Sequence, residues 1–347
     1  MNSKERVLRS IRHQEVDRTP SFYLGAPKAK VELCKKLGIN NDADEESLLS
    51  AFDVDVRYVM PRFLPGGDHF GFSYGSVHAQ IHGHADNSSD SCFPLEACKT
   101  VDEVRAWNWP SPDWYEYKLP QNKTEVYQEK AIVAYDMGII FLAAMGLRGI
   151  EGIMLDMAGE PEMADAIFAG IAKFNMGRTR QFLESNRGLI DIVGIGDDVA
   201  GQNGMLMSVE MWRRFLKPHI MDMVNLCREF NVVPYFHGCG GFRALFPDFI
   251  EMGIPCVGRL QTEARGNNFK EIKEEFGKDL CLWGGIDGQH IMIEGRVKDV
   301  EEHVAELLKI GAINSGYVAG PTHSFTDDTP AENIIAAYRA LSGRTRC

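Results

Sequence analysis

A histidine and a cysteine stand two residues apart, at His237 and Cys239, at the end of the run VVPYFHGCGG. Valine, tyrosine and phenylalanine favour a strand, along which side chains alternate with period two. If the strand continues through Cys239, both side chains point the same way. Imidazole and thiolate together suit zinc, and the three glycines let the backbone turn sharply beside the pair. The run therefore predicts part of a metal site at the end of a buried strand.

Two other interpretations of these residue types stay open. His237 and Cys239 can also be a hydrogen-bonded histidine and a buried thiol with no metal. His82 and His84 have the same spacing and form a rival metal pair, but Asp86 is the one acidic residue close by in the sequence, which favours surface histidines.

Composition and charge narrow the class of protein. The chain has 347 residues, of which 44% are hydrophobic and 25% charged, as in globular proteins. The net charge of −12 argues against nucleic acid or an anionic membrane as partner, because both attract clustered lysine and arginine. No apolar run is long enough to span a bilayer, and the charged start MNSKERVLRSIRHQE lacks the apolar segment of a secretion signal. We therefore expect a cytoplasmic protein with reduced thiols.

Strand-like runs recur along the chain and alternate with helical patterns. A long helical region at about 145–186 is interrupted at 159–161, and another helix is expected from Ser208 to about 229. Eight strands are expected, near residues 21, 56, 133, 192, 234, 257, 282 and 318. Eight such units predict an α/β fold of the (β/α)8 TIM-barrel type. A doubly wound open sheet is the alternative, but no GxGxxG follows the first strand.

Residues 61–125 interrupt this rhythm. They contain four histidines and the aromatic, proline-rich run WNWPSPDWYEY. We interpret the segment as an insertion between the second and third strands that covers the barrel mouth, so that 1–347 is a single domain.

Polar residues collect where the expected strands end, which is the functional face of a barrel. As catalytic candidates we take the three acidic residues Asp197, Asp198 and Asp287, although each could instead cap a turn. As substrate-binding candidates we take the four residues Tyr135, Met137, Gln202 and Gln261.

Several longer motifs resemble one family along nearly the whole chain. They are KERVLRSIRHQEVDRTP, GDDVAGQNGMLMSVEMWRRFLKP, YFHGCGGFRALFPDFIEMGI, LWGGIDGQ and GYVAGPTHSFTDDTPAENI. Together they resemble the uroporphyrinogen decarboxylase superfamily, which includes zinc-dependent methyltransferases that act with corrinoids. The resemblance implies a (β/α)8 barrel, in agreement with the strand count.

The resemblance also implies a ligand set. The methyltransferase branch binds zinc with an H-x-C pair after the fifth strand and a cysteine after the last one. His237 and Cys239 match the pair, but His323 stands at the third place. Three protein ligands and one open position would make a catalytic site for one zinc per chain. The decarboxylase branch also has a histidine at this place, without a metal, so Cys281 is kept as a reserve ligand.

The implied function is zinc-dependent methyl transfer between a small-molecule donor or thiol acceptor and a corrinoid, with an O-demethylase as one form of it. The corrinoid would be carried on a separate protein, because this chain lacks a D-x-H-x-x-G cobalamin signature. The first alternative is a metal-free decarboxylase of tetrapyrroles, but SFYLGAPKAK stands where that branch has an RQAGRY-like motif. The second alternative is a non-catalytic binder of a corrinoid protein or a tetrapyrrole. Superfamily members often dimerise, which makes a homodimer an expectation.

Overall fold

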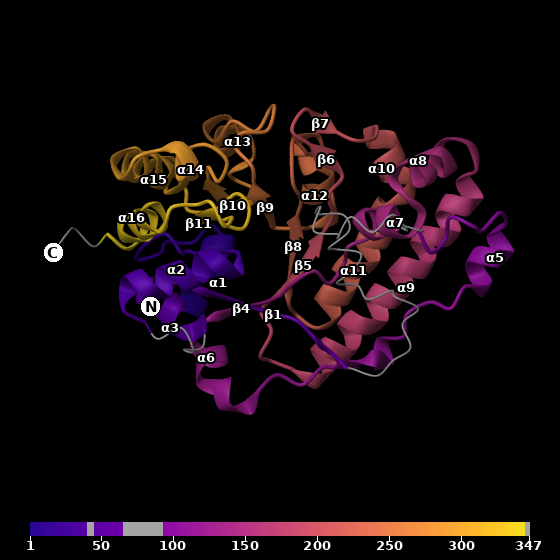
Figure 1. Ribbon diagram of the computed structural model, residues 1–347, viewed down its shortest axis with the longest axis horizontal. Coiled ribbons are helices and arrows are strands. Elements are labelled where there is room, and N and C mark those ends of the chain that lie inside the picture. Colours follow the sequence, from indigo (N-terminus) through magenta and orange to yellow (C-terminus); the bar gives the residue numbers. More distant parts are fainter. Residues whose placement is uncertain (40–44, 65–92, 344–347) are drawn as a thin grey trace.

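Seven parallel strands form one curled sheet in the computed structural model, which describes residues 1–39, 45–64 and 93–343 (Figure 1). Neighbouring strands follow the order of the chain: β1 (Val56–Val59), β4 (Ala131–Ala134), β5 (Ile192–Gly196), β8 (Val233–His237), β9 (Cys256–Leu260), β10 (Cys281–Ile286) and β11 (Tyr317–Pro321). The predicted α/β architecture with a parallel sheet is therefore confirmed.

The strand expected near residue 21 is reduced to a single bridge. Ser21 pairs in parallel with Ala319 of β11, and the Ser21 carbonyl accepts a hydrogen bond from the Asp55 N–H at 2.9 Å. This segment thus lies between the last strand and the first, in the eighth position around a TIM-barrel-like sheet.

Helices flank the strands on both sides (Figure 1). They are α1 (Ser3–Ile11), α2 (Pro27–Leu37), α3 (Glu45–Ala51), α5 (Val101–Ala106), α6 (Thr124–Glu129), α7 (Phe141–Arg148), α8 (Ile150–Gly159), α9 (Pro161–Ser185), α10 (Val209–Phe215), α11 (Lys217–Glu229), α12 (Phe246–Met252), α13 (Phe269–Phe276), α14 (Ile291–Glu294), α15 (Val297–Gly311) and α16 (Ala331–Ser342). In the part of the chain that is described, no helix has the length and apolar character needed to cross a membrane.

Local signals explain where several helices begin. Pro161 starts α9, as predicted, because proline has no N–H to lose at the first helical position. The Ser208 hydroxyl accepts the Met211 N–H at 3.1 Å and caps α10. The sequence predicted a single helix after Ser208, but the structure has two, α10 and α11. Pro218, the second residue of α11, has no N–H to continue the first helix, so a new helix begins there.

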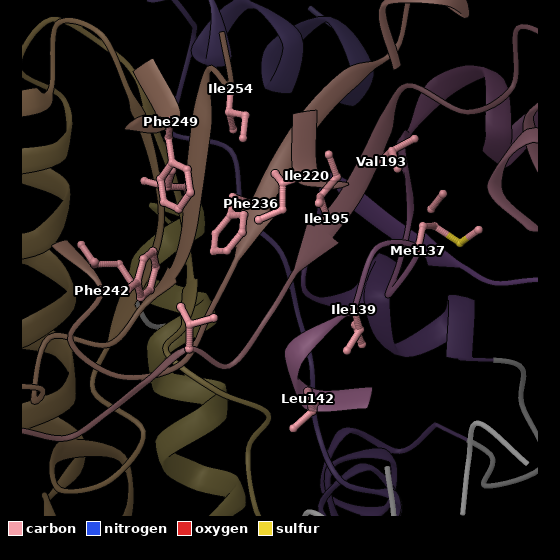
Figure 2. Close-up of a cluster of buried hydrophobic side chains, with 14 of the residues drawn as sticks. Met137, Ile139, Leu142, Val193, Ile195, Ile220, Phe236, Phe242, Phe249 and Ile254 are labelled. Carbon is pink, nitrogen blue, oxygen red and sulfur yellow. The ribbon is translucent and has the colours of Figure 1, made fainter. Parts of the chain in front are cut away.

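Two apolar clusters divide the core between the outside and the inside of the barrel. Figure 2 shows Val193, Ile195 and Phe236 among side chains of the surrounding helices, with Phe236 stacked on Phe249 at 4.3 Å between ring centroids. Tyr235, the neighbour of Phe236, belongs to the inner cluster instead. His237 follows with the parity of Tyr235, so its side chain also points into the barrel.

Helix α1 fills the amino-terminal end of the barrel. Its Val7 and Ile11 pack with residues at the beginnings of strands, such as Val56, Cys256 and Cys281. Because this end is filled by apolar side chains, a site inside the barrel must open at the carboxyl ends of the strands.

The described parts of the expected insertion lie along α9. β2 (Arg62–Phe63) pairs with β3 (Tyr115–Glu116), and the Trp109 ring packs directly on Gly170 of α9. The short elements of the described chain are the 3-10 helices η1 (Pro112–Trp114), η2 (Gln121–Lys123) and η3 (Arg243–Leu245), and the hairpin of β6 (Ala200–Gly201) and β7 (Gly204–Met205). His82 and His84 lie outside the described residues, so an insertion over the mouth stays a prediction.

Asp55 holds the barrel closed and gives a test of the fold. Its carboxylate has no exposed surface and accepts hydrogen bonds from Arg6 of α1 at 2.6 Å, Arg18 at 2.7 Å and the Ser21 N–H at 2.9 Å. Asp55→Ala leaves buried cations short of a partner, so we expect the free energy of unfolding to fall by about 3–5 kcal/mol in urea denaturation.

The exposed Glu5–Arg9 pair provides the matched control, because its two side chains are 46% and 43% exposed. Glu5→Ala should change the free energy of unfolding by about 0.5 kcal/mol. Equal effects of the two substitutions would contradict the role assigned to Asp55.

Candidate metal centre

His237 is the last residue of β8 and lies between two glycines of the neighbouring strands. Gly196 of β5 and Gly258 of β9 are its partners in the sheet register. A Cβ atom on Gly196 would come to 3.0 Å from the His237 Cβ, which is tighter than most side-chain contacts. The absence of a side chain at Gly196 therefore makes room for the imidazole at the end of the barrel interior, whereas Gly258 lies close to the Trp283 backbone of β10.

Hydrogen bonds fix the orientation of this imidazole. The His237 Nδ1 lies 3.2 Å from the Gly258 carbonyl oxygen, and the Nε2 lies 2.7 Å from the Arg259 Nη2. Burial, with the nearby Arg259 charge, lowers the pKa of His237 to about 3 although Asp198 opposes the shift. The ring is therefore neutral at pH 7, which is the form that binds metals.

Cys239 and Asp198 lie beside His237 in the loops that follow β8 and β5. The Asp198 Oδ1 accepts the Cys239 N–H at 3.0 Å, which ties the two loops together. Burial, and after it the Asp198 charge, raises the pKa of the Cys239 thiol well above its ordinary value. The thiol is thus protonated without a metal, and a metal would have to displace that proton.

These three residues suit a zinc ion. Their donor atoms all lie within 4.8 Å of one another. Among the described residues, this is the one group of three or more histidine, cysteine or acidic side chains that lie close enough together to hold a metal ion. Imidazole, thiolate and carboxylate are the ligand types that zinc prefers. Asp198, which the sequence predicted as a catalytic residue, therefore lies at the position of a third metal ligand. His323 is exposed and lies outside this group, but it lines the same cavity.

The cavity has a volume of about 780 Å³. It opens among the loops at the carboxyl ends of several strands, and its lining includes Gly25, Tyr135, Asp136, Leu142, Asp197, Asp198, His237, Cys239, Arg259, His323, Phe325, Asp327 and Asp328. Among these described residues the carboxylates outnumber the one arginine. The site therefore presents mainly negative charge to a substrate.

Arg259 and Asp136 are site residues that sequence reasoning missed. Arg259 lies in β9, is 5% exposed, and donates a hydrogen bond to the Tyr135 hydroxyl at 2.8 Å. Burial raises the pKa of Asp136 to about 6, although Arg259 and Arg178 oppose the shift. The signal available for Arg259 was an arginine inside the apolar run Cys256–Leu260, because a buried charge is rare without a specific partner.

Asp197 lines the cavity with a carboxylate that caps a helix. Its oxygens accept the backbone N–H groups of Ile140, Phe141 and Leu142 at 3.2, 2.5 and 2.8 Å, at the start of α7. Burial raises the pKa of Asp197 to about 7, although these N–H groups oppose the shift. This places Asp197 as an anchor of α7, a helix that the sequence did not connect with it.

Asp287, the third acidic candidate, lies in a separate polar cluster. Its Oδ1 accepts the N–H groups of Gln289 and His290 at 2.9 and 2.8 Å. It also pairs with Glu263, whose pKa is raised to about 7 by burial and by this carboxylate. Neither Asp287 nor Glu263 belongs to the described lining of the cavity.

Of the four substrate-binding candidates, the structure places Tyr135 in the lining of the cavity. Met137 is fully buried in the outer core, and Gln202 is exposed on the β6–β7 hairpin. The Gln261 Oε1 accepts the Gly240 N–H at 2.8 Å and so holds the glycine-rich turn after β8. The structure thus places Tyr135 beside the metal pair in the cavity, whereas the other three residues lie outside its described lining.

Cys281 is wrong as a reserve ligand. It is the first residue of β10, pairs in register with Cys256, and packs in the inner cluster against α1. His237 lies instead at the carboxyl end of its strand. Six strand residues at about 3.3 Å each separate the two ends of β10, which puts Cys281 out of reach of Cys239.

Comparison with known proteins places this chain in a family. The sequence profile described as uroporphyrinogen decarboxylase (URO-D) matches residues 121–343, more than half of the chain. Among solved structures, a methyltransferase from Methanosarcina mazei has a similar fold, with 16% identity, 99% of both chains covered and a TM-score of 0.65. The native xylanase 10B from Thermotoga maritima, at 10% identity, 87% and 99% coverage and a TM-score of 0.42, is too distant to support an inference. No curated protein sequence matches the chain.

The lowered pKa of His237 predicts a loss of stability in acid. The unfolded chain takes up a proton at the ordinary value of 6.5, whereas the metal-free folded protein does so near 3. The free energy of unfolding therefore decreases as the pH is lowered below 6.5. At pH 5 the protonation of this residue in the unfolded chain has removed about 2 kcal/mol of it.

His237→Gln removes this contribution and serves as the comparison. We expect the wild type's advantage over His237→Gln in free energy of unfolding to shrink by about 2 kcal/mol between pH 7.5 and pH 5. Urea denaturation of both metal-free proteins measures it. An advantage that stays constant with pH would show that His237 is not held neutral.

Proposed function

Because the chain belongs to the uroporphyrinogen decarboxylase family, we propose that it is an enzyme of that family's zinc-dependent methyltransferase branch. The observation that supports this proposal is the convergence of His237, Cys239 and Asp198, with donor atoms within 4.8 Å of one another beside a cavity. A decarboxylase that works without metal has no need for an H-x-C pair at this place. The fold shared with the Methanosarcina mazei methyltransferase is consistent with the proposal.

The residues of the chain would hold and shape the metal site. Zinc bound there supplies a Lewis acid that lowers the pKa of a coordinated thiol or polarises an oxygen. With its proton on Nδ1, beside the Gly258 carbonyl, the neutral His237 has its lone pair on Nε2, which lies 2.7 Å from the Arg259 Nη2. Asp198, through the Cys239 N–H, positions the thiol against the imidazole. We propose His237 and Cys239 as ligands, with Asp198 and His323 as candidates for the third.

The substrate is a small molecule that gives or takes a methyl group, with an O-demethylase among the forms of the reaction. The cavity of about 780 Å³ is of the size that binds such molecules. The second methyl carrier would be a corrinoid on a separate protein that reaches the cavity from its mouth. In this role Tyr135, on the cavity wall, would contact the substrate. A cytoplasmic location and a homodimer remain predictions.

The decarboxylase remains the second candidate because His323 lines the cavity at the place where that branch also carries a histidine. The charge of the cavity opposes it. A substrate with eight carboxylates needs several cations, whereas the described lining has five aspartates and one arginine. A binder of a corrinoid protein or a tetrapyrrole without chemistry is the third candidate, and loss of any measured turnover in His237→Ala would exclude it.

Metal analysis of the purified protein tests the proposed function. We expect about one zinc per chain, because the donor set is that of a single site. His237→Ala and Cys239→Ala should each lose it, and Cys98→Ala serves as the control, because Cys98 is a free thiol that the structure places outside the donor group. A native protein without metal after zinc is supplied under reducing conditions would contradict the methyltransferase; turnover of uroporphyrinogen without metal would then favour the decarboxylase.

The third ligand is tested by a matched pair of variants. We expect Asp198→Asn to weaken zinc binding more than His323→Ala, because the Asp198 carboxylate already lies within 4.8 Å of both other donors. Chelator competition measures the two affinities. The reverse order would assign the position to His323, as the sequence predicts.

A further inference from the structure

Arg259 is hydrogen-bonded to the imidazole of His237, which is a proposed ligand of the metal. Its Nη2 lies 2.7 Å from the His237 Nε2, its Nε lies 3.4 Å from Nδ1, and its backbone N lies 3.2 Å from Nδ1. Both ring nitrogens are thus in contact with one residue. A guanidinium always carries its protons and cannot accept a hydrogen bond, so the imidazole must provide the lone pair.

The tautomer of the ring decides which lone pair is involved. The Arg259 Nη2 at 2.7 Å from Nε2 can only donate a hydrogen bond, so a proton on Nε2 would face another donor. The proton of the neutral ring therefore belongs on Nδ1, 3.2 Å from the Gly258 carbonyl oxygen, which also accepts the Gly238 N–H at 3.0 Å. The neutral ring then has its lone pair on Nε2, directed at Arg259. A metal ion bound through Nε2 would need the same lone pair.

We propose that Arg259 and a metal ion are alternative partners of His237, so that the guanidinium leaves Nε2 when a metal binds and then faces the cavity as its cation. This inference rests on the metal site of the proposed function. It assigns to Arg259 a positioning role that sets the metal affinity of the site and couples metal binding to the charge of the substrate pocket.

Other partners are available to the released guanidinium. Its Nη2 already donates to the Tyr135 hydroxyl at 2.8 Å, and it interacts electrostatically with Asp136 and Asp198. Arg259 is also the one lysine or arginine in the described lining. Once turned from His237, it can stay on the cavity wall and bind an anionic group of a substrate.

A second effect of Arg259 acts in the opposite direction but is weaker. Its charge favours the Cys239 thiolate, so its removal would make the thiol harder to ionise. That effect acts through space, whereas the contact with Nε2 blocks a donor atom and repels a doubly charged ion at close range. Removal of Arg259 should therefore tighten metal binding overall.

The test compares zinc affinities by chelator competition under reducing conditions. We expect Arg259→Gln to bind zinc at least tenfold more tightly than the wild type. Arg259→Lys keeps the charge but reaches less far, and should fall between the two. Arg214→Gln is the control, since it removes the same charge from an exposed pair with Asp165 and should match the wild type. Circular dichroism confirms that each variant is folded; if Arg259→Gln does not fold, Arg259→Lys alone must bind more tightly than the wild type.

Each outcome separates this inference from the proposed function. Zinc in the wild type with equal or weaker binding in the Arg259 variants would overturn the inference and leave the methyltransferase standing. Zinc in the variants but none in the wild type would support the inference and contradict a zinc-loaded native enzyme. No zinc in any of them would overturn both. A purely structural role of Arg259 predicts lost affinity, so a gain cannot come from damaged packing.

Discussion

The register between β5, β8 and β9 is the constraint on which the site depends. It sets His237 between Gly196 and Gly258, and the close approach of the strands leaves no room for a side chain on Gly258 and little room for one on Gly196. The same register brings the loop with Asp198 next to the loop with Cys239. A shift of one residue would turn His237 outward among the phenylalanines that cover the sheet. The chemistry of the site is thus a consequence of strand pairing.

The closure of the barrel explains why this end carries the site. Helix α1 and the segment at Ser21 fill the other end with apolar side chains and with the buried Asp55 and its two arginines. Polar groups inside the barrel therefore lie near the carboxyl ends of the strands. There Arg259, Tyr135 and His237 satisfy one another by hydrogen bonds away from solvent. An arginine in such a place is stabilised only by these partners.

The sequence predicted the features that depend on local pattern. The seven strands of the sheet and the interruption before Pro161 follow from residue types within each segment. The sequence also predicted that His237 and Cys239 lie together, but its reason, a strand that continues through Cys239, is wrong: β8 ends at His237, and Cys239 lies in the loop that follows. The end of the barrel at which they lie follows from the fold class. Cys281 could have been rejected on the same ground, because it begins its strand while the site lies where strands end.

Features that depend on distant partners could not be read from the sequence. Asp197 reads as a catalytic acid or a cap of its own turn, yet it caps α7, more than fifty residues earlier in the chain. Asp198 joins the donor group because of the tertiary contact with Cys239. Arg259 looks like an interruption of an apolar strand until β8 is placed beside it. In each case the partner that determines the role of the residue is distant in sequence, so the local spacing of side chains cannot predict the contact.

The central claim is that His237 and Cys239 form a zinc centre, and X-ray absorption at the zinc K-edge of the zinc-loaded protein tests it most directly. The account predicts one sulfur neighbour per zinc at about 2.3 Å, with nitrogen and oxygen neighbours at about 2.0–2.1 Å. The sulfur contribution should vanish in Cys239→Ser. A first coordination sphere of nitrogen and oxygen alone in the native protein would contradict the claim.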